Sequence, residues 1–297
     1  MVDEMKAVGP PPPPPDHLRY TWPATWSLIY DRDLGAGMGA HMQVTIREKK
    51  DFATLRLTAN LPSRQEMGFF RTVLPDAEVD RIRALVRVSD YLKYGHRGAM
   101  RPDTPTVSLR ENENVSTFLP DSPPPASVIA VFHALDAIAE EIIKHPFKTL
   151  RGEAKWAAPQ VKRGEHVEVS VALRSVGSEL ILIDDPLGSA SATWVGLRLK
   201  VAKDKPVAQL DWEKDVKQFD LVPQNLLTAE GKLAKGHPSR IELAPGAELR
   251  FLARRKLLLS EGHYKGTLTF VGGSDDRDGR IVDGFLTMDL GPITVTR

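Results

Sequence analysis

The sequence predicts an α+β domain followed by an all-β immunoglobulin-like sandwich. Two observations support this: apolar residues recur at helical spacing in the first half, and short alternating runs of apolar and polar residues fill the second. A length of 297 residues suggests two domains rather than one. We expect a disordered proline-rich tail over residues 1–17, an α+β domain over 18–147 and a sandwich over 148–297.

The tail contains six consecutive prolines, Pro10 to Pro15. Proline lacks a backbone N–H, and a proline run favours an extended polyproline II helix without internal hydrogen bonds. We interpret the tail as a stiff spacer. A ligand for an aromatic groove is the alternative.

The first domain is expected to run strand pair, helix, strand pair, helix. Residues 42–46 and 52–57 alternate between apolar and polar side chains, with a short polar link that suits a hairpin. Pro75 fits the first position of a helix, and acidic residues follow it where the helix dipole favours them. Gly95 is the expected end of this helix. Residues 106–109 and 115–118 predict a second hairpin.

The clearest predicted helix runs from Ala126 to Lys144. Its apolar residues recur at spacings of three and four, which places them on one face: Val128, Val131, Phe132, Leu135, Ile138 and Ile142. His133 lies beside that face, so we expect it to pack at the boundary of the core. His145-Pro146 ends the helix.

The second domain shows period-two runs and frequent turn residues. Alternation of this kind is typical of half-buried antiparallel strands, and seven or more short strands favour a sandwich. An insertion over 204–237 is more polar and is expected to form a long loop or a short helix. The predicted strands cover residues 167–173, 195–201, 241–243, 249–257, 265–271 and 284–290.

Segments of both domains resemble known inhibitor families. The stretch IELAPGAELRF followed by LSEGHYKGTLTF resembles bacterial immunoglobulin-like domains, among them the small intracellular proteinase inhibitors of bacilli. This resemblance implies a sandwich in which Tyr264 occupies a tyrosine corner. The helix start TVLPDAEVDRIRALV, with its flanking hairpins, resembles the emfourin-type metalloprotease inhibitors. The resemblances carry no inhibitory residue over to this chain.

Motifs of familiar catalytic chemistry are missing from the sequence. The absence of cysteine excludes disulfides, thiolate metal sites and a cysteine nucleophile. The eight histidines include no zinc-protease motif, and no Gly-x-Ser-x-Gly nucleophile elbow occurs. We therefore predict no catalytic residues, no cofactor and no bound metal.

Three loops rich in glycine or aspartate are the predicted partner-binding elements. Loops on a rigid scaffold commonly carry recognition, and glycine lets the backbone approach a partner closely. Aspartates add charge that can steer association with a basic surface. The predicted partner-binding residues are Gly35, Gly37, Gly39, Asp184, Asp185, Leu187, Ser189, Ser274, Asp275, Asp276 and Asp278.

These features favour a non-catalytic protein-binding function. The 40 basic and 39 acidic residues give a formal charge of +1, which does not indicate nucleic-acid binding. No membrane span or secretory signal is expected, and cytoplasmic localisation is predicted. The leading hypothesis is an inhibitor or immunity protein that blocks a bacterial enzyme or toxin. A scaffold component of a larger assembly is the alternative, and an enzyme with an unrecognised site is the third.

Overall fold

A computed structural model describes most of the chain from Trp26 onward. It covers residues 26–33, 41–47, 53–61, 64–95, 106–119, 122–187, 196–233, 238–273 and 282–297. The predicted tail over 1–17 lies outside these ranges. The N-terminal half denotes residues 27–142, and the C-terminal half denotes residues 146–296.

The N-terminal half places four strands before its first long helix. The sequence predicted only two, so the expected order was incomplete. The elements are β1 (Ser27–Asp33), β2 (His41–Arg47), β3 (Ala53–Leu57), β4 (Glu66–Thr72), α1 (Asp76–Ser89), η2 (Tyr91–Lys93), β5 (Val107–Glu111), β6 (Asn114–Phe118) and α2 (Ala126–Ile142).

The C-terminal half contains the predicted strands and several further elements. The 204–237 insertion, for which a loop or a short helix was expected, contains the short helix α3 and, in addition, strands β12 and β13. The elements are β7 (Pro146–Trp156), β8 (Gln160–Lys162), β9 (His166–Ser175), β10 (Ile181–Asp184), β11 (Gly196–Lys203), η3 (Val207–Gln209), α3 (Trp212–Asp215), β12 (Val216–Leu221), η4 (Pro223–Asn225), β13 (Leu226–Thr228), β14 (Arg240–Leu243), β15 (Glu248–Lys256), β16 (Gly262–Gly272) and β17 (Gly284–Thr296).

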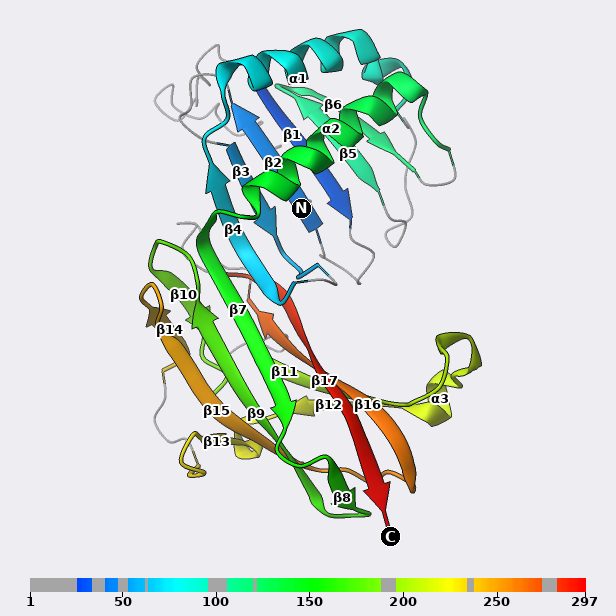
Figure 1. The fold of residues 1–297 in the computed structure, drawn as a ribbon, viewed down its shortest axis with the longest axis vertical. Coiled ribbons are helices and arrows are strands. Elements are labelled where there is room, and N and C mark those ends of the chain that lie inside the picture. The colour runs from blue at the N-terminus through cyan, green and yellow to red at the C-terminus, as the bar shows by residue number, and fades with distance from the viewer. Residues whose placement is uncertain are drawn as a thin grey trace, which may run out of the picture.

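One antiparallel sheet runs through both halves (Figure 1). Among the described residues it has ten strands, in the order β13-β15-β9-β7-β4-β3-β2-β1-β5-β6. The halves join where β4 pairs with β7, with Glu66 opposite Arg151 and Phe69 opposite Lys148. The predicted domain boundary at 147/148 therefore falls inside β7. That boundary remains a prediction, which unfolding experiments can test.

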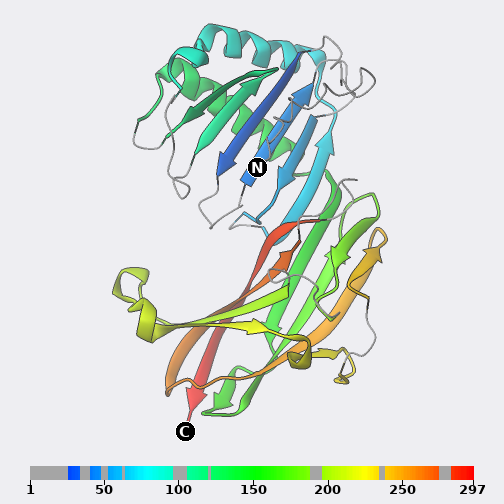
Figure 2. The ribbon, with the colours of Figure 1, turned by 180° about the vertical axis from the view of Figure 1, so that it is seen from behind.

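The two halves of this sheet are covered on opposite faces. Helices α1 and α2 cover one face of the N-terminal half (Figure 1), and the sheet β12-β11-β16-β17-β8 covers the other face of the C-terminal half (Figure 2). Strand β4 shows the change of side: Met67 packs in the core of the C-terminal half, and Phe70 packs beneath the helices. Among the described residues, each half therefore leaves one sheet face without a second layer.

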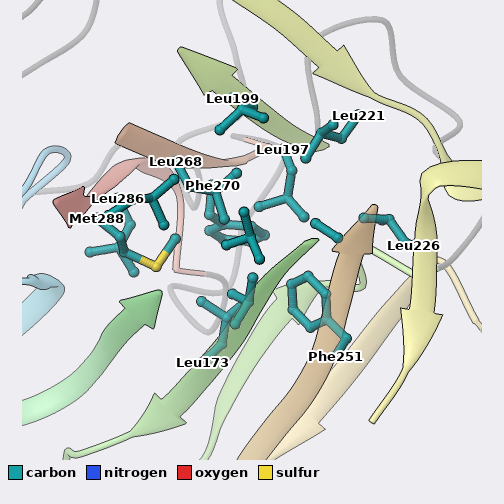
Figure 3. Packing of buried hydrophobic residues seen from close by; sticks show 14 of the residues in the cluster. Leu173, Leu197, Leu199, Leu221, Leu226, Phe251, Leu268, Phe270, Leu286 and Met288 are labelled. Carbon is teal, nitrogen blue, oxygen red and sulfur yellow. The ribbon is translucent and has the colours of Figure 1, made fainter. Parts of the chain in front are cut away.

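The sandwich of the C-terminal half is built from side chains of both of its sheets. Leu173 and Phe251 from the long sheet meet Leu197, Phe270 and Leu286 from the five-stranded sheet (Figure 3). The inward residues alternate with outward ones along each strand, as the period-two pattern predicted. These two packed sheets confirm the immunoglobulin-like β-sandwich.

Tyr264 confirms a detail of that prediction. Its side chain is buried, and its hydroxyl donates to the Ser260 carbonyl at 2.9 Å. A tyrosine hydroxyl bonded to the backbone a few residues upstream defines a tyrosine corner.

The predicted apolar face of α2 is buried, with Val128, Val131, Leu135, Ile138 and Ile142 in the core. Burying such side chains stabilises the fold by about 1.5–3 kcal/mol each before the entropy cost.

Two predictions about the helices were wrong. Helix α1 ends at Ser89 instead of near Gly95, because Asp90 adopts the left-handed conformation at φ 51° and stops the helix. His133 is exposed on α2 and does not pack at the core boundary. No helix within the described ranges is long and apolar enough to cross a membrane.

Candidate functional site

The residue that follows the loop between β1 and β2 is connected by hydrogen bonds, through Thr58, to β17, the last strand of the chain. The His41 N–H donates to Thr58 Oγ1 at 2.8 Å, and the Thr58 N–H donates to the His41 carbonyl at 3.0 Å. The Thr58 carbonyl accepts the N–H of Phe285 at 2.7 Å. Thr58 thus connects the start of β2 to the start of β17.

The stems of the other two predicted loops meet at the same junction. Gly273, which precedes the loop before β17, donates its N–H to Asp184 Oδ2 at 2.5 Å. Val282, which follows that loop, donates its N–H to the Leu182 carbonyl at 3.0 Å. Asp184 ends β10 and stands just before the third loop. Two of the three predicted loops therefore have stems bonded to each other within the C-terminal half, and the third is connected to them across the halves through Thr58 and Phe285.

Three predicted partner-binding residues are described, and all three are buried: Asp184, Asp185 and Leu187. Asp184 Oδ1 accepts from Arg240 Nε at 3.1 Å, and Asp185 Oδ1 accepts the Leu187 N–H at 2.8 Å. These bonds hold the turn after β10 in place. The side chains are withdrawn from solvent in this structure, so partner binding at this turn remains a prediction.

The remaining predicted partner-binding residues lie outside the described ranges, and their role also remains a prediction. They are Gly35, Gly37, Gly39, Ser189, Ser274, Asp275, Asp276 and Asp278.

The uncovered face of the N-terminal half lies next to these stems. One row of outward side chains crosses it, because residues opposite each other on paired strands share a face. The row runs from Asp31 through Gln43, Arg56 and Phe69 to Lys148. Sequence reasoning missed it, since its members come from five strands.

Hydrogen bonds fix most of this row. Asp31 accepts from Gln43 Nε2 at 3.0 Å and lies 3.0 Å from His41 Nδ1. Arg56 donates to both carboxylate oxygens of Asp283, at 2.9 and 2.7 Å. This last pair joins residues 227 positions apart and ties β3 to the segment before β17.

Cations and aromatic rings lie together at the junction end of the same face. The Arg71 guanidinium is 3.7 Å from the centroid of the Phe147 ring, and that of Arg56 is 5.4 Å from the centroid of Phe69. A guanidinium over an aromatic face is attracted by the ring quadrupole. These contacts hold the two arginine side chains against aromatic rings.

The uncovered face of the C-terminal half has a shallow hollow of about 480 Å³. Small side chains at its centre, Ser170 and Ala172, leave this space, and Glu153, Lys155 and Arg250 surround it. It faces the same side as the helices.

Within the described ranges, histidine, aspartate and glutamate side chains form no group of three or more placed to hold a metal ion. The absence of a metal, a cofactor and catalytic residues remains a prediction.

No protein-family model and no curated protein matches this chain. The chain is similar to the CARDB domain of a Pyrococcus furiosus protein, solved with two metal ions (12% identity, TM-score 0.24, 50% of this chain and 87% of that one). It is also similar to a sporulation control protein from Bacillus subtilis (13% identity, TM-score 0.27, 50% of this chain and 49% of that one). A third match is a PapD-like domain of human CEP192 (9% identity, TM-score 0.23, 49% of this chain and 87% of that one). The resemblance to protease inhibitor families remains a prediction.

Proposed function

We propose that this chain is a non-catalytic protein-binding protein, of the inhibitor or immunity type, that engages its target in the cytoplasm at the junction of its halves. The observation that most directly supports the proposal is the convergence of three loop stems on one hydrogen-bonded junction. Recognition commonly resides in loops held by a rigid scaffold. Both halves then contribute to a single binding surface.

The junction itself is firmly held, which favours binding. Asn60 accepts the Thr287 N–H at 2.7 Å and donates to the carbonyls of Arg64 and Thr287 at 2.9 and 3.1 Å. Together with the Arg56–Asp283 pair, these bonds fix the loop stems before any partner arrives. A preorganised surface loses less conformational entropy on binding, so more of the contact energy contributes to affinity.

The first experiment identifies the target and asks whether it is inhibited. The purified full-length protein is used to capture partners from a lysate of the native host, and each partner is isolated. Its own activity is then measured with increasing amounts of the protein. We expect the activity to be lost at about one equivalent of the protein, as for a tight one-to-one complex.

A pair of charge-reversal variants tests whether the loop before β17 takes part. The variant D275K/D276K/D278K is expected to associate more slowly, with a weaker salt dependence, because these aspartates steer a basic surface. The control E113K/E165K/E230K changes the net charge equally at exposed sites on other turns. It is expected to retain most of the association rate.

Three outcomes contradict parts of the proposal. Equal association rates for the two variants remove this loop from the site. Tight binding that leaves every captured partner active favours the scaffold alternative. Turnover of a substrate by the purified protein, abolished by one substitution that leaves the fold intact, contradicts a non-catalytic function.

A further inference from the structure

An excursion between β11 and β12 ends in an exposed apolar tip. We call residues 204–215 the arm; it projects from the body of the C-terminal half beside the label α3 (Figure 1) and again when seen from behind (Figure 2). Val207 is 72% exposed and Trp212 is 58% exposed. Tryptophan is among the more deeply buried residues on average, so an exposed one on a projecting segment calls for an explanation.

A carboxylate at the base holds the arm in shape. The Asp215 side chain is only 5% exposed. Its carboxylate forms ion pairs with Lys203 Nζ at 3.2 Å and with Lys205 Nζ at 3.0 Å. It also accepts the N–H of Asp211 at 3.2 Å. Charge-assisted bonds of this kind are stronger than neutral ones. The tip therefore has a defined conformation although it packs against little else.

A second set of bonds orients the tryptophan. Asp211 caps α3 by accepting the N–H groups of Glu213 and Lys214 at 3.1 and 3.3 Å. The ammonium of Lys200 lies 4.6 Å from the centroid of the Trp212 ring, which is a cation–π contact. Lys200 belongs to β11, so the ring lies beside a positive charge of the neighbouring sheet.

Lysines form a collar behind the apolar tip. Lys214 is exposed beside the tryptophan, and Lys217 donates to the Glu213 carbonyl at 2.8 Å. Asp204 is paired with Lys265 at 2.7 Å, and Asp211 is paired with Lys214 at 3.3 Å. Residues 204–215 themselves hold four acidic residues and two lysines. The surroundings of the arm carry an excess of positive charge because four lysines of the flanking strands lie against it: Lys200, Lys203, Lys217 and Lys265.

We propose that the arm is an anchor for an anionic membrane surface, with Trp212 and Val207 entering the interfacial layer. The apolar, aromatic and basic side chains of the arm match the layers of a bilayer: the acyl chains, the headgroup level and the lipid phosphates. The apolar tip meets the acyl boundary, the indole sits at the headgroup level it prefers, and the lysines behind it meet lipid phosphates. A convex tip with a basic collar suits a lipid surface better than a closed protein pocket. This inference is independent of the target-binding proposal.

The test is co-sedimentation of the full-length protein with vesicles. The probes are vesicles of phosphatidylcholine alone and vesicles in which about one lipid in three is phosphatidylglycerol, enough to give a negative surface potential. We expect binding to the anionic vesicles and weakening as salt is raised, because charges beyond the Debye length are screened. Absence of binding at low salt overturns the proposal and leaves the tip for a protein partner.

Matched variants show whether vesicle binding depends on the arm or on exposed apolar side chains in general. V207S/W212A is expected to lower the partition coefficient by at least about tenfold, since both apolar contacts with the interface are lost. The control V88S/L258S removes two other exposed apolar side chains, 79% and 80% exposed, and is expected to bind like the parent protein. Equal binding by V207S/W212A and the parent protein overturns the proposal. Circular dichroism checks that both variants are folded.

Discussion

At the residue scale, Gly284 decides how closely the two halves approach. Its φ is +120°, and a Cβ built there would lie 2.0 Å from the Thr58 carbonyl oxygen. That oxygen accepts the Phe285 N–H at 2.7 Å. A side chain at this position therefore has to push β17 away from the segment after β3. No rearrangement of a flexible side chain relieves the clash, because the obstacle is backbone.

We expect G284A to be strongly destabilising for this reason. A matched control is G196A, since Gly196 also has a positive φ, +144°, but a Cβ there meets nothing within 4 Å. Backbone strain alone predicts a loss of about 1–3 kcal/mol for G196A. G284A is expected to lose at least about 2 kcal/mol more in urea unfolding, because a clash adds to that strain. Equal losses contradict this account of the junction.

At the element scale, the arm depends on one ionised carboxyl. The Lys205 ammonium, the Asp211 N–H and the Lys203 ammonium lower the pKa of Asp215 to about 2. An aspartate pKa in an unfolded segment is about 3.9. Because the pKa of Asp215 is depressed in the folded arm, the ionised carboxyl stabilises the arm fully above about pH 4. This stabilisation is lost as the pH falls through about 2.

Hydrogen exchange across residues 204–215 tests this dependence. In the parent protein, exchange corrected for intrinsic rates is expected to stay constant at neutral pH and to accelerate below about pH 4. D215N is expected to exchange about tenfold faster already at neutral pH, as for a locally opened segment. The control is D220N, because Asp220 pairs with Arg198 at 3.2 Å but is exposed, and exposed pairs contribute little. Comparable effects of D215N and D220N contradict the assignment.

At the scale of the whole molecule, two hydrophobic cores share one sheet. The β4–β7 pairing, the Asn60 bonds and the Arg56–Asp283 pair all cross between the halves. Opening either half exposes backbone groups of the other that are hydrogen-bonded in the native state, which is unfavourable. We therefore expect far-ultraviolet circular dichroism and tryptophan fluorescence to report one coincident unfolding transition. Two separated transitions indicate domains that unfold independently.

The variant N60A tests the junction within this picture. Its side chain makes four hydrogen bonds, and removing them is expected to lower the free energy of unfolding by about 1–3 kcal/mol. N114A is the control, since Asn114 is exposed on the edge strand β6, and a change within about 0.5 kcal/mol is expected. A similar small change for both variants contradicts a stabilising role of Asn60.

Local periodicity alone identified α2 and most strands of the sandwich. Each of these elements buries one face along its whole length against one core. Apolar residues therefore recur about every 3.6 residues in the helix and every second residue in the strands, and this period can be recognised in the sequence. The tyrosine corner at Tyr264 was implied by the resemblance to bacterial immunoglobulin-like domains, and its hydrogen bond to the Ser260 carbonyl confirms it. The positions of the three loops were identified from glycine and aspartate content, but not their relation to one another.

The junction was decided by tertiary structure. Strand β4 faces one core at Met67 and the other at Phe70, so its sequence shows no regular alternation and the strand was missed. The convergence of the loop stems depends on Thr58 meeting Phe285 and on Asp184 meeting Gly273. Such contacts join residues that are distant in sequence. The local pattern of apolar and polar residues indicates which side chains are buried, but it does not indicate which distant residue each one contacts.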